Sequence, residues 1–548
     1  MAHCFLNSKD DFVSDAIDGL VATSGNSLAR LITPEKDTKV VIRADWSKDH
    51  VAVISGGGSG HEPTHPGFVG RGMLTAAVCG SVFASPSVSA ILSTIVQVTG
   101  DAGCLLVVKN YTGDRLNFGL AREIAKSKYG LEVEMVIVSD DIAIPQSAQP
   151  RGIAGTLFVH KIAGAAAESG ADLAEVSRVA QEVASRVMSI GVALTHCNMP
   201  GEAVKVNRVK PGMMEVGLGI HGEPGASTVP VESAAGTVNV LVEKLRRAAD
   251  RRRLSIKRTA LLVNNLGTCM PAEMNIIAKD ALDELEPDLL VGPASLMTSL
   301  DMHGFSLTLL PLTDEIEQLL TAPTVVPSWP SAKAPSVGRT IRVDKHISTE
   351  LTNSTPSSNP LYRARVEAAC DAVLSSEGEL NDLDSAVGDG DCGTTLAAGA
   401  RAVLSGIDEA PLADGHDLAL WLAEASSRMG GSSGVLAAIF FTAVAKVGDW
   451  SPAAVKAGVD AMTLYGGASL GSRTAMDALI PYAKALSAGD GLVGAAGEAM
   501  KGAESTATMS VATHGRSANV PGDALRGRTD PGALAVGRVV EAIAKAQG

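Results

Sequence analysis

Three aspartates stand close together in the second half of the chain. Asp384, Asp389 and Asp391 fall within eight residues, with glycines between them. Carboxylates at this spacing repel one another unless a cation lies among them, and their hard oxygens suit Mg²⁺. The spacing is not that of an EF-hand, because no glutamate stands at the twelfth position of the loop. The pattern predicts a magnesium site, with a solvated acidic turn as the alternative.

The residues that follow this loop could bind phosphate. Cys392, Gly393, Thr394 and Thr395 lead into a segment that is predicted to be helical. The N-terminus of a helix presents free backbone N–H groups and the positive end of the helix dipole, so it favours anions. Carboxylates for a metal beside amides for phosphate indicate a site for a magnesium–nucleotide complex.

Other loops in the same half of the chain could close over a nucleotide. They contribute small residues and one arginine, namely Ser432, Ser433, Gly467, Arg516, Asp530, Pro531 and Gly532. The stretch 430–434 also fits the GxSxG pattern of serine hydrolases. That pattern requires a buried strand before the serine, whereas the preceding segment is predicted to be helical. A hydrolase is therefore disfavoured.

A second group of candidate residues lies near the N-terminus. The apolar run Val51–Ile54 predicts a buried strand, and the small residues Gly56–Gly60 follow it as a loop. Glycines let backbone N–H groups approach a ligand closely, because no Cβ intervenes. The loop has neither the Gly-Lys-Ser/Thr ending of a P-loop nor the GxGxxG spacing of a dinucleotide site. A glycine-rich turn without a ligand is the alternative.

Two histidines follow this loop. His61 and His65 fit the HExxH pattern, which binds zinc when both imidazoles lie on one face of a helix. Pro63 removes a backbone N–H and restricts the residue before it, so this segment is a poor helix. A zinc hydrolase therefore stays only as a minor alternative.

A third imidazole and a loop carboxylate complete the candidates. His221 stands among the glycines of 217–225, which favours an accessible side chain. Asp114 lies in the loop that follows the predicted strand Leu105–Lys109, where an aspartate could equally form a turn. Neither residue alone indicates a reaction.

The elements that position these residues fall into two classes. Strands and helices alternate over 39–150, with Asn117–Lys128 among the helices, and this predicts a largely parallel sheet. Loops at the carboxyl ends of such strands meet at one edge, where ligands bind. A long helix is predicted over Ala171–Ile190, and a second alternating region over 257–312.

Composition excludes several classes of function. A chain of 548 residues predicts three or four domain-sized units. The net charge of −14 argues against nucleic acid or an anionic membrane as a partner. Seven scattered cysteines without a CxxC motif predict a reduced, cytoplasmic protein. The longest apolar run is too short to span a bilayer, and the N-terminus shows no signal-peptide pattern.

The predicted fold is an α/β domain followed by an all-α domain. The first covers 1–325, with subdomains at about 1–190 and 191–325, and a Pro- and Ser-rich linker follows over 326–358. The second covers 359–548. Its eight predicted helices are Leu361–Glu377, Thr394–Ser405, His416–Met429, Gly434–Val447, Ala453–Leu464, Ser472–Ser487, Leu492–Glu504 and Gly532–Ala546.

The combination of motifs resembles one known family. The stretches SGGGSGHEPTHPGFVGRGMLTAAVCGSVFASPS, VVKNYTGDRLNFG, GLGIHGEPG, MTSLDMHGFSLTLLPL, GDGDCGTT, MGGSSG and DPGA are similar to those of the dihydroxyacetone kinase family. The resemblance covers nearly the whole chain, in the expected order. It implies a ketose-binding α/β domain and an ATP-binding all-α domain.

The resemblance also implies roles for residues of the first domain. The imidazole that matches His221 attacks the ketone carbon of the substrate and forms a covalent hemiaminal. Gly58, Ser59, Gly60 and Lys109 match residues that line the ketose pocket. His61 and Asp114 match those that hydrogen-bond the substrate hydroxyls, with Asp114 expected as the general base.

In the second domain the resemblance implies two Mg²⁺ ions on the phosphates of ATP. Asp384, Asp389 and Asp391 match the metal ligands. Two segments depart from the family pattern, Gly466–Asp477, which includes Thr474, and Gly515–Asn519. Both segments belong to the part of the second domain that is expected to bind ATP, and Thr474 is a further predicted contact of the nucleotide.

The resemblance also leads us to expect that the protein forms a homodimer.

The leading hypothesis is ATP-dependent phosphorylation of a terminal hydroxyl of dihydroxyacetone or of a four-carbon ketose such as erythrulose. The alternative is a catalytically weak ketose-binding regulator, because the family fold also serves in transcriptional control. The aspartate triad argues against the regulator, since a sensor has no need of two metal ions. The sequence does not rank the ketoses, because the size of the pocket depends on packing.

Overall fold

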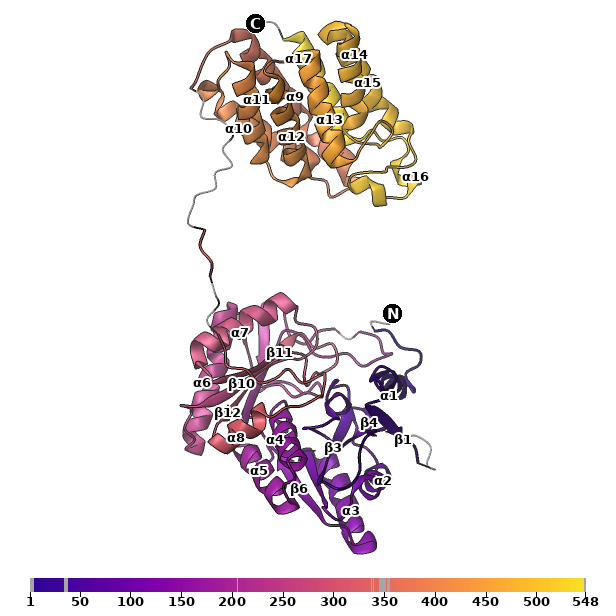
Figure 1. Cartoon of the computed structure of the whole chain (residues 1–548), viewed down its shortest axis with the longest axis vertical. Helices are drawn as coiled ribbons and strands as arrows, with labels where there is room; N and C mark the ends of the chain where they lie inside the picture. Colours follow the sequence, from indigo (N-terminus) through magenta and orange to yellow (C-terminus); the bar gives the residue numbers. More distant parts are fainter. Residues whose placement is uncertain are drawn as a thin grey trace. The chain divides into compact units, whose positions relative to one another are not determined.

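The computed structural model divides the chain into two compact units, Met1–Arg339 and Thr340–Gly548 (Figure 1). The structure describes residues 4–33, 38–204, 206–336, 338, 340–343, 351 and 355–546. The first unit is α/β and the second is helical, which confirms the predicted fold class. Among the described helices, none has both the length and the apolar character needed to cross a membrane.

The first unit contains a six-stranded sheet in the order β1-β2-β4-β3-β5-β6. Its last four strands run parallel to one another, and β2 pairs antiparallel with both β1 and β4. The parallel part was predicted, because strands that alternate with helices favour this arrangement. The strands are β1 (Leu28–Leu31), β2 (Val40–Arg43), β3 (Ala52–Ser59), β4 (Ala76–Val82), β5 (Cys104–Lys109) and β6 (Val133–Val138).

Helices cover both faces of this sheet. The helices α2 (Val88–Val98) and α3 (Thr112–Tyr129) pack on one face, in a core that includes Ile91 and Phe118. The helices α4 (Thr156–Glu168) and α5 (Leu173–Arg186) pack on the other face. Because both faces are covered, β5 is buried along its whole length, as is typical of parallel sheets.

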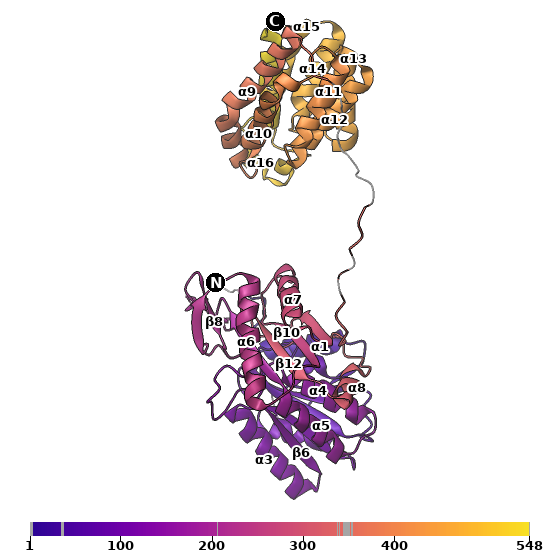
Figure 2. The same cartoon turned by 90° about the vertical axis from the view of Figure 1, so that its left-hand side faces the viewer.

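A second six-stranded sheet follows in the order β11-β10-β12-β7-β8-β9, in which only β10 and β11 pair in parallel. Residues of both sheets share one core with α4 and α5, so these helices lie between the sheets (Figure 2). The helices α6 and α7 contribute to a separate core on the second sheet. The elements are β7 (Met188–Ala193), β8 (Met213–Val216), β9 (Ser227–Pro230), α6 (Ala234–Arg252), β10 (Thr259–Asn265), α7 (Pro271–Leu285), β11 (Leu289–Ala294) and β12 (Gly304–Pro311), with α1 (Phe12–Ala22) before and α8 (Asp314–Thr321) after them.

Three predicted boundaries in this unit are wrong. The helix expected over Ala171–Ile190 ends at Arg186, because the β-branched residues from Val187 onward are extended and form β7. Strand β3 does not end before the glycines but runs through them to Ser59. Helix α3 begins at Thr112, so Asp114 lies in its first turn and not in a loop.

The predicted linker also begins later than expected. Val326 and Trp329 are buried in the core of the first unit, and Lys333 pairs with Leu290 of β11. Residues 326–333 therefore belong to the first unit, held there by an apolar anchor in an otherwise Pro- and Ser-rich stretch. Part of the remaining predicted linker, including 344–350 and 352–354, lies outside the described residues.

The second unit contains eight long helices and, among its described residues, no strand. Helix α9 is longer than predicted and extends to Ser385, so Asp384 lies in its last turn and not in a loop. Small residues dominate the core, where alanines of α15 and α17 meet Tyr482 and Met462. The helices are α9 (Pro360–Ser385), α10 (Cys392–Ser405), α11 (Gly415–Ser427), α12 (Gly431–Val447), α13 (Pro452–Gly466), α14 (Met476–Ala488), α15 (Gly491–Ser505) and α17 (Pro531–Lys545), with the short α16 (Gly522–Leu525).

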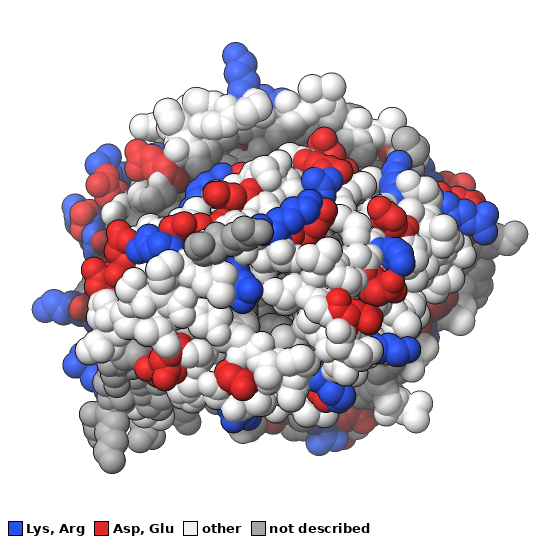
Figure 3. Space-filling view, turned by 90° about the horizontal axis from the view of Figure 1, so that it is seen from above, with Lys and Arg blue, Asp and Glu red and all other residues white. Residues whose placement is uncertain are grey.

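Acidic and basic side chains are interspersed on the face shown in Figure 3. On the helices, several exposed charges form ion pairs one turn apart, such as Lys456 with Asp460 and Lys545 with Glu541. Such exposed pairs contribute only about 0–1 kcal/mol each to stability. Because both signs of charge are mixed in this view, the surplus of acidic groups forms no single patch on this face.

Candidate active site

The carboxyl ends of β3 and β5 bring a lysine and an aspartate together. Lys109 is the last residue of β5, and Asp114 lies in the first turn of α3 just beyond it. Both lie against Gly57 of β3, where an added Cβ would be 3.2 Å from Asp114 Oδ2 and 3.4 Å from Lys109 Nζ. Gly57 also has a φ of +151°, which residues with a Cβ rarely adopt. The two strand ends meet at one edge of the sheet, as predicted.

Two imidazoles face each other beside this edge. His61 Nε2 lies 3.2 Å from His221 Nε2, and the rings meet edge to face with centroids 4.8 Å apart. His61 is fully buried, whereas the side chain of His221 keeps 19% of its exposure. A small ligand can therefore reach His221 from the solvent.

The other nitrogen of each ring lies against a fixed acceptor. His61 Nδ1 donates to the carbonyl of Thr298 at 2.8 Å, so its Nε2 is left with a lone pair. His221 Nδ1 lies 3.5 Å from Glu223 Oε1, and Glu223 Oε2 accepts from the backbone N–H of His221 at 2.8 Å. In the contact with His61, the Nε2 of His221 carries the proton, because two facing lone pairs would repel each other. The Glu223 carboxylate favours the other tautomer, with the proton on Nδ1, and His221 Nε2 becomes a nucleophile once the proton is there.

The charges around the imidazoles support this assignment. Burial lowers the pKa of His61 well below its ordinary value, and the neighbouring Lys109 and His221 lower it further. Burial opposes ionisation of Glu223, yet hydrogen bonds from the side chain of His221 and from backbone amides lower its pKa to about 2. At neutral pH the site therefore combines a neutral His61 with an ionised Glu223.

Lys109 is a buried cation. Its side chain is fully buried, and its Nζ has no hydrogen-bond partner among the described residues. Burial lowers the pKa of Lys109, and the negative charges of Asp114 and Asp140 oppose that shift. Asp114 is also buried, and its Oδ1 accepts from Ser85 Oγ at 2.5 Å. A buried ammonium usually has a partner, so Lys109 is available to an oxygen atom of a ligand.

The acidic triad lies in the second unit, where α9 ends and α10 begins. Each of Asp384, Asp389 and Asp391 offers a carboxylate oxygen, and these oxygens all lie within 4.8 Å of one another. Asp384 Oδ2 accepts from the backbone N–H groups of Asp391 and Cys392, at 3.0 and 3.2 Å. An added Cβ at Gly388 would be 2.5 Å from Asp384 Oδ1, so a larger residue there would displace this carboxylate.

Arg516 supplies the positive charge near this triad. Its Nη1 contacts Asp389 Oδ2 directly and lies 3.6 Å from Asp391 Oδ1. The guanidinium thus occupies the position where carboxylates of like charge need a cation. A set of three carboxylates fits Mg²⁺, which prefers oxygen ligands.

Comparisons with known proteins identify the family of both parts of the chain. The model of the Dak1 domain matches residues 19–328, and that of the DAK2 domain matches residues 386–545. Dihydroxyacetone kinase of Citrobacter freundii is 46% identical over 561 residues and covers 100% of both chains. The chain belongs to the dihydroxyacetone kinase family. The crystal structure of the C. freundii kinase with AMP-PNP and Mg²⁺ matches with a TM-score of 0.82 and 46% identity over 100% of both chains.

Two further relatives show the range of this family. L-erythrulose 1-kinase of Mycolicibacterium smegmatis is 36% identical over 573 residues and covers 98% of both chains. The structure of a dihydroxyacetone kinase operon co-activator matches with a TM-score of 0.54 and 32% identity. It covers 58% of this chain and 98% of its own. The family thus includes proteins named as kinases and one named as a co-activator.

The glycine run that resembles the family pocket is used partly for internal packing. Ser59 Oγ donates to the carbonyl of Gly80 at 2.8 Å, and the N–H of Gly60 donates to the Glu62 carboxylate at 3.1 Å. An added Cβ at Gly58 would be 2.8 Å from the backbone N of Ala84. The expected open loop over a ligand is therefore wrong for this run. The predicted ketose contacts of Gly58, Ser59 and Gly60 stay predictions.

Four residues near the imidazoles were not found from the sequence. Phe83 stacks on His61 with centroids 5.3 Å apart, and the ring of Tyr111 meets that of His221 edge to face at 4.5 Å. Phe83 directly follows the end of β4 and Tyr111 comes two residues after the end of β5, which was a usable signal. Glu223 lies two residues from His221 and could have been tested as its partner. Thr298 comes from the second sheet, so no local pattern identifies it.

The predicted phosphate site at the start of α10 is partly occupied by a side chain. Asn381 Oδ1 accepts from the N–H of Thr394 at 3.0 Å, and Asn381 Nδ2 donates to Thr394 Oγ1 at 2.9 Å. Thr395 donates its N–H to the carbonyl of Asp391 within the helix. Gly393 packs against α9, since an added Cβ would be 2.1 Å from the carbonyl oxygen of Glu377. A phosphate here would have to displace Asn381.

The remaining predicted nucleotide residues lie in adjoining loops. Asp530 caps α17 by accepting from the N–H of Ala533 at 2.9 Å, and burial raises its pKa to about 6. Pro531 and Gly532 form the first turn of that helix. The methyl of Thr474 lies 4.0 Å from an added Cβ at Gly515, beside Arg516. Gly467 ends α13 beside His514, and Ser432 and Ser433 are exposed in the first turn of α12.

The local structure excludes both hydrolase alternatives, the zinc hydrolase at His61 and His65 and the serine hydrolase at Ser432. Residues 61–65 form a turn and not a helix, and His65 is buried against Ser55 Oγ at 3.2 Å. Among the described residues, two groups have the spacing of metal ligands, and neither includes His61 or His65. Ser432 follows the helix α11 and not a strand, so it is not at a nucleophile elbow.

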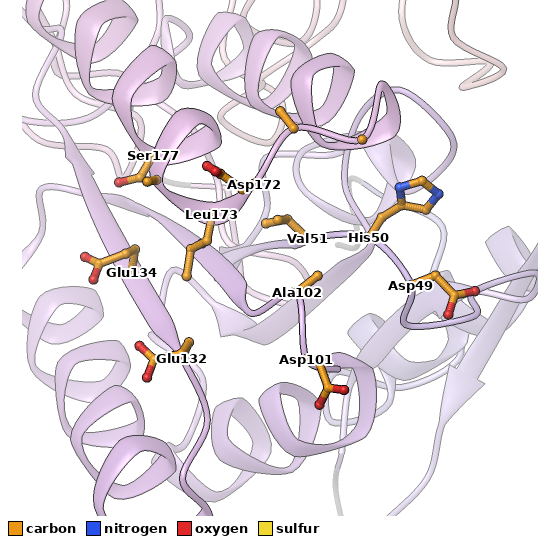
Figure 4. Close-up of a pocket in the computed structure, with 13 residues that line it drawn as sticks. Asp49, His50, Val51, Asp101, Ala102, Glu132, Glu134, Asp172, Leu173 and Ser177 are labelled. Carbon is orange, nitrogen blue, oxygen red and sulfur yellow. The ribbon is translucent and has the colours of Figure 1, made fainter.

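A cavity of about 810 Å³ lies at the opposite end of the first sheet. Asp49, Asp101 and Glu132 line it and come just before the amino ends of β3, β5 and β6 (Figure 4). None of the predicted site residues lines it. Because ligands of parallel sheets bind at the carboxyl ends of strands, this cavity is not the ketose site.

Proposed function

We propose that the chain is an ATP-dependent kinase that phosphorylates a terminal hydroxyl of a short-chain ketose. The substrate is dihydroxyacetone or a four-carbon ketose such as erythrulose, in line with the names of its relatives. The observation that carries this proposal is the pair of facing Nε2 atoms, 3.2 Å apart, with a carboxylate at Nδ1 of His221. A ketone has an electrophilic carbon for this nucleophile, whereas a polyol such as glycerol has none.

The first step forms a hemiaminal on His221. Nε2 adds to the ketone carbon, so that an N–C bond forms while the C=O double bond becomes a single bond to oxygen. Overall, the imidazole proton moves from Nδ1 to the former carbonyl oxygen through solvent. Glu223 stabilises the positive charge that develops on the imidazole during the addition. His61 Nε2, which carries a lone pair, accepts a hydrogen bond from a substrate hydroxyl.

Asp114 acts as the general base for the terminal hydroxyl. It is buried beside Lys109, and Ser85 holds one of its oxygens at 2.5 Å. The other oxygen lies at Gly57, where a ligand hydroxyl can approach because no side chain intervenes. A positioned base of this kind contributes a factor of about 10²–10⁴ to the rate. Lys109 would hold a substrate oxygen by its free ammonium.

Asp384, Asp389 and Asp391 would hold two Mg²⁺ ions on the phosphates of ATP. The three residues fit magnesium, because they offer carboxylate oxygens and no soft ligand. The contact of the Arg516 guanidinium with Asp389 also shows that a positive charge is favourable at this place. ATP would supply the phosphoryl group, and the magnesium ions would neutralise its charge. The loops around Thr474, Arg516 and Asp530 would enclose the nucleotide.

The runner-up is a ketose-binding regulator, and one observation favours it. The match to an operon co-activator covers 58% of this chain and 98% of the co-activator. The second unit argues against it, because the match to the C. freundii kinase extends over both units and the triad retains three carboxylates.

The homodimer expected from the sequence stays a prediction that light scattering of the full chain would test.

The test combines an activity assay with direct observation of the adduct. An assay that couples ADP formation to NADH oxidation is run with dihydroxyacetone, glyceraldehyde and both erythrulose enantiomers. In parallel, a ketose labelled with ¹³C at its carbonyl carbon is added to the full chain. The ¹³C signal should move from the carbonyl to the sp³ region. Turnover without this change would reject the hemiaminal, and an adduct without turnover would favour the regulator.

A further inference from the structure

A cysteine, a glutamate and a histidine meet in the first unit, apart from the imidazole pair. Each of Cys269, Glu273 and His303 offers one possible metal ligand, and these three atoms all lie within 4.8 Å of one another. The meeting follows from the topology. Strands β10 and β12 are antiparallel neighbours with Asn265 opposite Phe305, so the chain after β10 lies beside the chain before β12.

The three side chains form a mixed set of sulfur, nitrogen and oxygen donors. Such a set is typical of Zn²⁺, whereas Mg²⁺ and Ca²⁺ prefer oxygen alone. His303 Nε2 lies 3.1 Å from Glu273 Oε1 and 3.2 Å from Glu273 Oε2. Two ligands of a tetrahedral zinc ion, with bonds of about 2.0–2.1 Å, are roughly 3.3 Å apart. The imidazole and the carboxylate are therefore already at ligand spacing.

Contacts outside the three ligands hold their backbones in place. Asn265 Nδ2 donates to the carbonyl of Cys269 at 2.8 Å, and Asn265 Oδ1 accepts from its N–H at 3.3 Å. Glu273 Oε2 accepts from the N–H of Met270 at 2.7 Å, at the start of α7. The N–H of His303 donates to Thr195 Oγ1 at 2.9 Å. A metal ion would therefore find its ligands ordered in advance, which favours binding.

The site is open on one side. The side chains of Glu273 and His303 keep 32% and 31% of their exposure, while Cys269 is buried. The Cys269 thiol now donates to the carbonyl of Gly304 at 3.2 Å. An ion can enter from the solvent on the side of Glu273 and His303 and reach the thiol beneath them.

We propose that Cys269, Glu273 and His303 form a binding site for a zinc-like divalent cation, with water as the fourth ligand. The metal–sulfur bond replaces the S–H bond, and the thiol proton passes to solvent. His303 now donates its Nε2 proton to Glu273; on binding, this proton moves to Nδ1 through solvent, and His303 coordinates through the freed Nε2 lone pair and Glu273 through one oxygen. The site is separate from the aspartate triad, whose ligands are all oxygen.

The ion would stabilise one wall of the ketose site. His303 directly follows the segment 296–302, which includes Thr298 and Leu300, and the N–H of Thr268, next to Cys269, donates to the carbonyl of Met302 at 3.2 Å. Thr298 accepts from His61 Nδ1, and the N–H of Leu300 donates to the carbonyl of Gly60 at 2.9 Å. A cation that ties α7 to the start of β12 therefore restrains this segment. Binding to the folded state alone should raise the unfolding temperature of the first unit.

The test uses Co²⁺ as a spectroscopic probe on the full chain. The protein is stripped with EDTA, dialysed, and titrated with Co²⁺ in saturating Mg²⁺, so that the aspartate triad is already filled. One equivalent should give a near-ultraviolet thiolate-to-cobalt band together with the visible bands of tetrahedral cobalt. Zn²⁺ should abolish these bands by displacement and should raise the unfolding temperature.

Three variants make the result specific. Cys269→Ser should abolish the thiolate band, and His303→Gln should weaken Co²⁺ binding about tenfold or more. Cys392→Ser is the matched control, because Cys392 is the thiol beside the aspartate triad, and it should leave the band unchanged. If Cys269→Ser does not fold, the partly exposed His303→Gln decides the matter. Absence of a thiolate band in the parent protein, or its loss only in Cys392→Ser, would overturn the proposal.

Discussion

The imidazole pair and the aspartate triad achieve their geometry in opposite ways. In the first unit His61 is fully buried, and fixed protein acceptors hold Nδ1 of both His61 and His221. In the second unit the side chains of Asp389 and Asp391 keep 49% and 59% of their exposure, and Arg516 balances their charge. Protein groups alone orient the two imidazoles, whereas the triad needs a cation.

The difference follows from where each set of residues lies. A sheet between helix layers can bury polar groups, provided that each has a partner, and burial then strengthens the interactions. The triad lies on a helix end and a turn, where water screens the charges and their spacing depends on the bound ion. The two sites should therefore respond differently to mutation, to pH and to magnesium.

His221→Ala should have the largest effect. Without the nucleophile no hemiaminal forms, the ketose is not positioned, and kcat/KM for the ketose should fall by about a thousandfold. The ¹³C signal of the labelled ketose should then stay in the carbonyl region. His50→Ala is the control, because His50 lines the cavity at the opposite end of the sheet. An adduct in His221→Ala would assign the nucleophile to another residue.

Asp389→Ala should impair the aspartate triad and leave the imidazole site intact. Removal of one magnesium ligand should lower ATP-dependent turnover by about a hundredfold, because charge on the phosphates is then poorly neutralised. The ¹³C adduct should persist, since it depends only on the first unit. Asp382→Ala on the same helix is the control, because Asp382 is exposed and is not part of the triad. Loss of the adduct in Asp389→Ala would contradict the independence of the two sites.

Glu223→Gln should have an intermediate effect within the imidazole site. The amide keeps the shape of the side chain but removes the charge that favours a proton on His221 Nδ1. KM for the ketose should rise about tenfold, while KM for ATP stays unchanged. The fraction of ketose bound as the adduct should fall in parallel. An equal change in both KM values would indicate a general structural defect in place of a positioning role.

The sequence predicted the two sites unequally, and for physical reasons. Lys109 and Asp114 were placed at one edge because alternating strands and helices favour a parallel sheet. The partner of His61 was not predictable, because Thr298 reaches it through tertiary packing from the second sheet. The glycines were misassigned to a loop, since glycine permits both a turn and a strand against close neighbours. Asp384 was placed in a loop because the helix signal of α9 weakens before its last turn.

The stability of the first unit should depend on pH through Glu223 in the imidazole site. The pKa of Glu223 is about 2 in the folded state, below its ordinary value of 4.5. A depressed carboxyl pKa stabilises the folded state above the ordinary value, and this contribution is lost as the pH falls toward 2. The difference in unfolding temperature of the first unit between the parent and Glu223→Gln should be constant from pH 7 to 5. It should then shrink as the pH is lowered further, and a difference that grows in acid would refute this.

Arg516→Ala should have the smallest effect, a change in the affinity of the triad for Mg²⁺. It tests whether the triad, unlike the imidazole pair, is ordered only by a bound cation. An exposed ion pair contributes about 0–1 kcal/mol, so loss of the competing guanidinium should raise the affinity of the triad for Mg²⁺ by no more than about fivefold. Calorimetric titration with Mg²⁺ in the absence of nucleotide measures this change. Arg538→Ala is the control, because Arg538 pairs with Glu379 outside the triad. If Mg²⁺ affinity falls in Arg516→Ala, the arginine orders the carboxylates for the metal, and the triad is preorganised like the imidazole pair.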